Sequence, residues 1–239
     1  MLIENTLFGV TDKVQESIDL IKAYEPEEGY YVAFSGGEDS IVTLDLVKRS
    51  GVKYDAHYMR AMEPPEVVYF IRKHYPDVQR HLPKKTMWQL IRDNGIPPLR
   101  TIRYCCQALK EIGGKGRVVV TGTRRAESVA RKNRQEWARV NGKEMLSPIL
   151  FWDADDVWDY IRNEGLAYPS LYDEGRTRIG CVMCPCGGPK QMQDDALRWP
   201  DIAEAIRRAC CRAYDPATSK DWKNGNDMYE WWLTGKAKE

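Results

Sequence analysis

The sequence predicts an α/β fold: a doubly wound, mostly parallel sheet with an appended C-terminal helical region. Over the first two thirds of the chain, apolar β-rich runs alternate with amphipathic runs at helical spacing. A glycine-rich turn joins the first buried strand to its helix. From residue 165 onward the pattern is loops and helices without a strong strand. We therefore expect an α/β domain with an N-terminal helix at 1–164. A cysteine-containing loop and helical extension, packed on that domain, is expected at 165–239.

The predicted elements follow from residue patterns in chain order. Val14, Ile18 and Ile21 share one apolar face, which predicts a helix over 11–24 that ends before Pro26. Buried strands are predicted at 30–34, 54–59, 117–122 and 145–150. Further helices are predicted at about 41–49, 64–74, 86–93 and 155–163. Strands that alternate with helices indicate crossover connections, and hence parallel pairing.

The composition narrows the class of protein. A chain of 239 residues can bury a substantial core, and its formal net charge of +1 gives no global field toward nucleic acid or membranes. No stretch is long and apolar enough to span a bilayer, and the N-terminus lacks a signal-peptide pattern. Seven cysteines in such a chain favour metal or redox chemistry over structural disulfides. We expect a cytoplasmic protein without a membrane partner.

The turn after the first strand has the composition of an anion site. It consists of Ser35, Gly36, Gly37, Glu38, Asp39 and Ser40. Glycines let the main chain approach an anion closely, and the following helix directs its N–H groups and positive dipole end to the same place. The two serines add hydroxyl donors. An ordinary tight turn is the alternative, but the full string in a strand–helix context favours a phosphate cradle.

Two cysteine pairs form a second signal. Cys105 and Cys106 are adjacent, and Cys181 and Cys184 form a Cys-x-x-Cys motif. Together they can supply four thiolates to one centre, which suits a [4Fe–4S] cluster or tetrahedral zinc. Buried, inert thiols are the alternative.

Arginines supply candidate anion contacts. The segment that follows the strand at 117–122 contains Gly122, Arg124, Arg125 and Ser128. This segment and the glycine-rich turn both follow strands, so both should reach the carboxyl edge of the sheet, where ligands bind. Guanidinium groups grip phosphate or sulfate oxygens bidentately. Arg176 and Arg178, just before the second cysteine pair, are further candidate anion contacts.

The Ser-Gly-Gly-x-Asp-Ser string resembles the PP-loop of the ATP-pyrophosphatase and PAPS/adenylyl-sulfate reductase superfamily. Members of the PAPS-reductase family also pair a Cys-Cys with a later Cys-x-x-Cys. The similarity covers roughly residues 28–200, and its blocks occur in the family's order. These are Arg103-Tyr104-Cys105-Cys106, Trp152 with Asp155-Asp156-Val157-Trp158, Leu171-Tyr172-Asp173-Glu174-Gly175, and Arg178-Ile179-Gly180-Cys181.

The resemblance implies an adenine nucleotide alpha hydrolase-like fold and an enzyme of sulfur metabolism. It implies a [4Fe–4S] cluster held by the four paired cysteines. It also implies an adenine nucleotide at Ser35–Ser40, with Gly122, Arg124, Arg125 and Ser128 contributing. Glu38 matches the acidic loops of adenylyl-sulfate reductases, whereas many ATP-splitting members have Lys there. A carboxylate at this position would repel pyrophosphate.

One departure leaves the reaction open. Thiol-dependent family members carry a nucleophilic cysteine in a C-terminal Cys-Gly-x-His motif, which this sequence lacks. Cys186 is the candidate substitute nucleophile, and Asp39 is the candidate that orients the loop or a Mg²⁺ ion. One branch reduces adenosine 5'-phosphosulfate (APS) or PAPS to sulfite with a thiol reductant.

The other branch uses ATP, with Mg²⁺, to activate an acceptor for thiolation by a sulfur donor. In this branch nucleic acid is a partner only as the acceptor that is thiolated. A zinc-stabilised, non-catalytic binding module is the remaining alternative.

Overall fold

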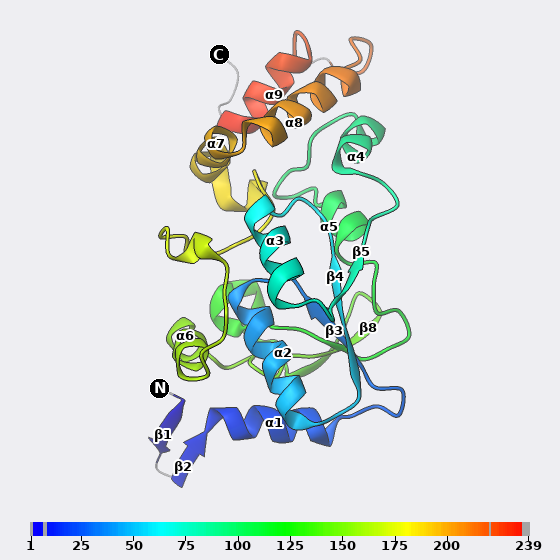
Figure 1. The fold of residues 1–239 in the computed structure, drawn as a ribbon. Helices are drawn as coiled ribbons and strands as arrows, with labels where there is room; N and C mark the ends of the chain where they lie inside the picture. Colours follow the sequence, from blue (N-terminus) through cyan, green and yellow to red (C-terminus); the bar gives the residue numbers. More distant parts are fainter. Residues whose placement is uncertain (1, 7–8, 220, 236–239) are drawn as a thin grey trace. The chain divides into compact units, whose positions relative to one another are not determined.

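The structure, a computed structural model, describes residues 2–6, 9–219 and 221–235 (Figure 1). The chain divides into two compact units. Unit 1 consists of Met1–Tyr58, Glu66–His81 and Gly113–Arg178. Unit 2 consists of Met59–Pro65, Leu82–Ile112 and Ile179–Glu239.

Unit 1 is built on a six-stranded sheet in the order β5-β4-β3-β6-β8-β7. Its strands are β3 (Tyr30–Phe34), β4 (Tyr54–Met59), β5 (Gln79–His81), β6 (Val119–Val120), β7 (Trp137–Val140) and β8 (Lys143–Leu146). In this sheet β3 pairs in parallel with β4 and β6, β6 pairs in parallel with β8, and β7 and β8 form an antiparallel hairpin. The predicted mostly parallel sheet is confirmed.

The strand order reverses next to β3. The chain runs outward from β3 through β4 to β5 and then returns to place β6 on the other side of β3. In open α/β sheets the crevice beyond the carboxyl ends of the strands at such a reversal is where ligands bind. The turns that follow β3 and β6 are therefore the parts of unit 1 best placed to bind a ligand.

Four α-helices of unit 1 connect or flank the strands of this sheet along the chain. They are α1 (Lys13–Ala23), α2 (Glu38–Ser50), α3 (Pro65–His74) and α6 (Ala154–Asn163). Asp12 caps α1, and Asp153 and Asp156 form a capping box on α6, so the sequence itself sets where these helices begin. A hairpin of β1 (Ile3–Thr6) and β2 (Gly9–Asp12) precedes α1.

Two strand predictions need correction. The strand expected at 145–150 ends at Leu146, and the backbone then turns, with Leu150 N–H donating to the Ser147 carbonyl. Pro148 explains the end, because proline offers no N–H to a sheet ladder. The strand expected at 117–122 is reduced to β6. The helix at Tyr104–Leu109 and the strands β1, β2, β5 and β7 were not predicted.

Unit 2 is helical. It contains α4 (Met87–Asn94), α5 (Tyr104–Leu109), α7 (Gly188–Arg198), α8 (Pro200–Ala213) and α9 (Gly225–Thr234). α8 packs against α4, α7 and α9. The absence of a strong strand after residue 165 is confirmed for the described residues. Within the described part of the chain, no helix has the length and apolar character needed to cross a membrane.

The contacts do not divide the chain at residue 164. Residues 82–112 group with the C-terminal helices, because α4 packs on α8 and the Trp232 indole donates to the Pro98 carbonyl at 2.6 Å. Residues 165–178 group with the sheet, because Tyr172 hydrogen-bonds to the start of α2. The helical unit therefore includes the segment with the first cysteine pair, which the expected boundary assigned to the α/β domain.

Candidate functional site

The turn between β3 and α2 requires glycine for two reasons. Gly36 has a φ of +77°, which favours glycine, and a Cβ there would lie 2.8 Å from side-chain carbons of Ile71. Gly37 is the N-cap of α2 and has no side chain to occupy the first N–H groups of the helix. The turn thus brings backbone donors to the switch point of the sheet.

The two serines close this turn on itself. Ser40 Oγ donates to the Gly37 carbonyl at 2.8 Å and accepts from the Ser35 N–H at 3.2 Å. The Ser35 hydroxyl also donates to Ser40 Oγ at 3.2 Å. The hydroxyls predicted to bind an anion therefore also preorganise the loop, and the exposed Ser35 is the one open to solvent.

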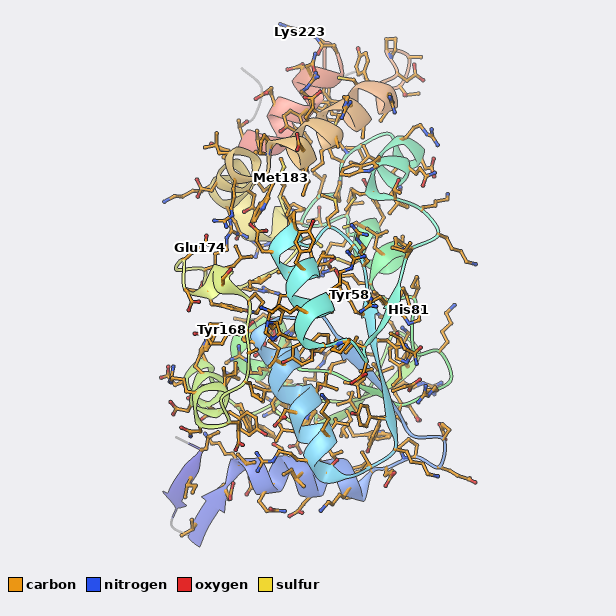
Figure 2. All side chains as sticks on the ribbon, in the orientation of Figure 1. Tyr58, His81, Tyr168, Glu174, Met183 and Lys223 are labelled. Atoms are coloured by element: carbon orange, nitrogen blue, oxygen red, sulfur yellow. The ribbon has the colours of Figure 1, made fainter. Side chains whose placement is uncertain are left out.

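Tyr172 contacts the start of α2. Its phenol accepts a hydrogen bond from the Glu38 N–H at 3.1 Å and donates one to the Glu38 carboxylate. Burial and the Glu38 charge raise the pKa of Tyr172, so the phenol keeps its proton. The Tyr172 ring packs edge-on against Trp158, with 4.9 Å between the ring centres, and edge-on against Tyr168, which is labelled in Figure 2.

Sequence reasoning placed Tyr172 in a family block but not in the site. Its position beside Glu38 depends on a contact between residues 134 positions apart. The surrounding block of the sequence was the only signal that could have pointed to it.

The turn after β6 meets the turn after β3. Arg124 donates from Nε to Asp39 Oδ1 at 2.7 Å, and both side chains are largely buried. A Cβ on Gly122 would lie 2.7 Å from the Asp39 backbone, so glycine allows the two turns to approach. Burial and the neighbouring Glu38 charge raise the pKa of Asp39 to about 7, against the lowering effect of Arg124.

The other predicted anion contacts differ in their surroundings. Arg125 donates from Nε to the Arg134 carbonyl at 2.9 Å, and its guanidinium lies 4.3 Å from the centre of the Phe151 ring. Ser128 and Arg178 are exposed, and Arg176 is half-buried. Of the four arginines predicted to contact an anion, the structure brings Arg124 to the turn after β3, whereas the described hydrogen bonds of Arg125 hold its own loop.

The four paired cysteines line one pocket within unit 2. Cys105 and Cys106 lie on α5, and Cys181 and Cys184 lie in the segment before α7. The rest of the pocket wall is mainly apolar and includes Met62, Met87, Ile91, Leu109, Val182 and Trp232. Among the described residues, no three His, Cys, Asp or Glu side chains are placed to hold a single metal ion. The thiols thus surround a pocket instead of converging on one point.

Cationic side chains contact two of these thiols. Arg103 donates from Nη2 to Cys106 Sγ at 3.4 Å. The hydrogen bond from Cys105, with Arg103 nearby, lowers the pKa of Cys106 to about 5. Lys110 lies 3.2 Å from Glu63 Oε1 and hydrogen-bonds to Cys181. Negative charge on sulfur is thus favoured at Cys106, whereas burial raises the pKa of Cys181 and Cys184, and the hydrogen bond with Cys106, together with burial, raises the pKa of Cys105.

The remaining cysteines lie elsewhere in unit 2. Cys186 is exposed in the short helix Pro185–Gly187 and hydrogen-bonds with Cys184. Cys210 is buried in α8, and the exposed Cys211 thiol lies 3.2 Å from Asn226 Oδ1. None of these three lines the pocket of the paired cysteines.

Comparisons with known proteins identify relatives. A profile described as "Phosphoadenosine phosphosulfate reductase domain" matches residues 29–186. The chain is 31% identical over 220 residues to an uncharacterized protein of Methanocaldococcus jannaschii, covering 82% of this chain and 45% of that protein. It is 29% identical over 209 residues to adenosine 5'-phosphosulfate reductase 2 of Bacillus subtilis, covering 80% of this chain and 87% of that protein. The chain thus spans about half the length of the archaeal relative.

A solved structure agrees on the fold. The phosphoadenylyl-sulfate reductase of Candida auris, in its phosphate complex, matches with a TM-score of 0.51 at 20% identity. The match covers 70% of this chain and 87% of that one. At this identity the likeness concerns the fold, and it supports the predicted adenine nucleotide alpha hydrolase-like class.

Proposed function

Because this chain belongs to the phosphoadenosine phosphosulfate reductase domain family, we propose that it is an enzyme of sulfur metabolism that binds an adenine nucleotide at Ser35–Ser40. The observation that carries the proposal is the glycine turn at the β3–β6 switch point, which opens the 13-residue helix α2. A helix N-terminus and converging backbone N–H groups favour a phosphate or sulfate group there. Arg124 adds a cation at the same turn.

The first candidate reaction is reduction of APS or PAPS, as in the named relatives. A cysteine thiolate attacks the sulfonate sulfur and breaks the sulfur–oxygen bond to the nucleotide phosphate. The nucleotide leaves, and the sulfonate stays on the enzyme as an S-sulfonate. A thiol reductant then attacks the enzyme sulfur, forms a disulfide and releases sulfite. Cys186 is the candidate nucleophile, and its exposure fits attack on an entering ligand.

The second candidate is ATP-dependent thiolation, with Mg²⁺ accompanying ATP. The hydrogen bond from Tyr172 to Glu38 favours it, because a donor on the carboxylate reduces the repulsion that Glu38 would exert on pyrophosphate. In either reaction Asp39 orients the loop through Arg124. An acceptor, which includes nucleic acid, and a sulfur donor would be the partners of this second reaction.

We propose that Cys105, Cys106, Cys181 and Cys184 hold a [4Fe–4S] cluster. Support comes from the donor set, since four thiols from two segments line one apolar pocket with cations on two of them. A bound cluster would supply an iron–sulfur group able to carry an electron. The alternative is a zinc ion bound by the same thiols in a non-catalytic module. Measurement of the iron and zinc contents distinguishes the two. A cytoplasmic location stays a prediction from the sequence.

Sulfite release from APS and from PAPS tests the reaction. The protein is purified anaerobically, its iron and zinc contents are measured, and a thiol reductant is supplied. We expect sulfite that disappears in Cys186→Ser and persists in Cys211→Ser, the matched exposed thiol. Sulfite in both variants would remove Cys186 as nucleophile and keep the reductase.

No sulfite from iron-loaded protein would overturn the first candidate. The same preparation is then given ATP and Mg²⁺, and release of AMP and pyrophosphate is followed with and without a sulfur donor. Failure of APS, PAPS and ATP to bind in calorimetry would overturn the nucleotide site itself.

A further inference from the structure

Helices α4 and α8 border a groove that the proposed reaction does not use. Its volume is about 410 Å³, and all of its lining residues belong to unit 2. The lining residues are Thr86, Trp88, Gln89, Arg92, Ala205, Arg208, Ala209 and Arg212. On α8 they recur at intervals of three and four, so they form one stripe along the helix. The two alanines leave room between the arginines.

The groove is positively charged, with no carboxylate among its lining residues. Two of its three arginines, Arg92 and Arg208, each have an acidic neighbour that is shared with a cation outside the groove. Glu204 binds Arg207 at 2.7 Å and lies 3.6 Å from Arg208. Asp93 binds Lys85 at 2.8 Å and lies 3.8 Å from Arg92.

Arg212 has no hydrogen-bond or ion-pair partner in the described part of the chain. It lies one helical turn from Arg208. Like charges at this spacing repel each other, so the pair costs stability unless something negative binds there.

The net charge of the whole chain does not reveal that unit 2 is positively charged. Unit 2 has 16 Lys and Arg against 12 Asp and Glu, a formal charge of +4. Unit 1 has 20 against 23, a formal charge of −3. The near-neutral total that argued against nucleic acid is therefore a sum of two opposite charges.

The shape and chemistry of the groove select the class of ligand. Arg208 and Arg212 are spaced about 6 Å apart along the helix axis, so they can reach successive anions along a strand. Trp88 is half-buried and stacks on no other ring in the described ranges. Because Trp88 lines the groove beside the arginines, its indole can accept an unpaired base, which a duplex keeps stacked.

We propose that this groove binds single-stranded nucleic acid, with phosphates on Arg92, Arg208 and Arg212 and a base on Trp88. The inference is independent of the nucleotide site in unit 1. A strand of this kind matches the acceptor class of the thiolation reaction, so binding here would favour that candidate over sulfite production.

Fluorescence anisotropy of labelled RNA and DNA strands of about 20 nucleotides tests the proposal on the full chain. No APS, PAPS or ATP is added, so failure here leaves the nucleotide proposal untouched. Three phosphate contacts predict that log K falls against log salt with a slope of about −2. Arg208→Ala with Arg212→Ala should weaken binding at least about tenfold at about 50 mM salt and reduce the slope to about −0.7.

The control pair is Lys190→Ala with Lys223→Ala, which removes the same charge from exposed positions of unit 2 outside the groove (Lys223 is labelled in Figure 2). It should change affinity less than about threefold. Trp88→Ala should cost about tenfold, and Trp88→Phe should restore most of the loss. Thermal unfolding of each variant identifies a folding defect.

Several outcomes would overturn the proposal. One is no binding by the wild-type chain at low salt. Another is equal loss in the groove and control pairs, which would mean that strands bind by charge alone. Groove-dependent binding of a free nucleotide, a duplex or an acidic peptide as tight as that of the strand would also overturn it. In that case the groove would be a site for another anion and not for single-stranded nucleic acid.

Discussion

Arg124 and Asp39 join the two turns that flank the switch point of the sheet. The Arg124 Nε lies 2.7 Å from Asp39 Oδ1, although the residues are 85 positions apart. Arg124 is a cation that could bind an anionic ligand, and Asp39 is a carboxylate that would repel the same ligand. The balance between them, with Glu38 and Glu127 as the other charged neighbours of Asp39, sets the charge that a nucleotide meets.

Binding of APS should weaken as pH rises through about 7. Burial and Glu38 raise the pKa of Asp39 to about 7, so the carboxyl is neutral below this pH and repels an anion above it. We expect a loss of about tenfold across this range, and a flat profile for Asp39→Asn. Calorimetry at a series of pH values measures it, with Asp159→Asn on the exposed face of α6 as the control. A flat wild-type profile would contradict the raised pKa.

Glu38→Gln should bind ATP more tightly, by about tenfold, because it removes a negative charge from the start of α2. Tyr172→Phe should do the opposite, since it removes the phenol that donates to the carboxylate. Titration calorimetry with ATP separates the two. Weaker binding by Glu38→Gln would mean that the carboxylate itself contacts the ligand.

Gly36→Ala should destabilise the protein more than Gly51→Ala. Both glycines have a left-handed φ, of +77° and +74°, so both substitutions carry the same backbone cost of about 1 kcal/mol. Only Gly36 would place its Cβ against Ile71, while Gly51 faces open space. The clash should lower the free energy of unfolding of Gly36→Ala by about a further 1–3 kcal/mol, as measured by urea unfolding. Equal losses would show that the loop can shift away from Ile71.

Cys105→Ser should lose iron and acid-labile sulfide, whereas Cys210→Ser should keep both. Cys105 lines the pocket of the paired cysteines, and Cys210 is buried in α8 outside it. Metal analysis of anaerobically purified protein checks the difference. Full iron in both variants would remove Cys105 from the ligand set, and stoichiometric zinc without iron would replace the cluster.

Asp156→Asn should cost about 2 kcal/mol of unfolding free energy near neutral pH. Asp156 is fully buried, pairs with Lys13 at 2.7 Å and accepts from the Asp153 N–H. Burial raises the pKa of Asp156, but these partners outweigh it and hold the pKa below its usual range.

The contribution of Asp156 is present above the unfolded-state pKa of about 4 and is lost as pH falls through the folded-state pKa. Urea unfolding at several pH values measures it, with Asp159→Asn as the surface control. A difference that persists at the lowest pH would mean that the loss comes from packing and not from the charge.

Local patterns predicted much of the fold. The helices predicted at 11–24, 86–93 and 155–163 are present within one or two residues of those bounds. Their N-caps are Asp12, Thr86 and Asp153, residue types that favour this position. Two predictions of strand length failed, because tertiary contacts determine where these strands end. β6 keeps two residues of a longer β-branched run because strand length depends on its neighbours β3 and β8.

For this protein, the sequence by itself determined the glycine turn, the four paired thiols and the alternation of strands and helices, because these depend on residue type at short spacing. Only the tertiary structure decided that Arg124 meets Asp39, that Tyr172 meets Glu38, and that the arginines of α4 and α8 share one groove. Each of these joins residues far apart in the chain. Their meeting depends on sheet order and helix packing, which no local pattern encodes.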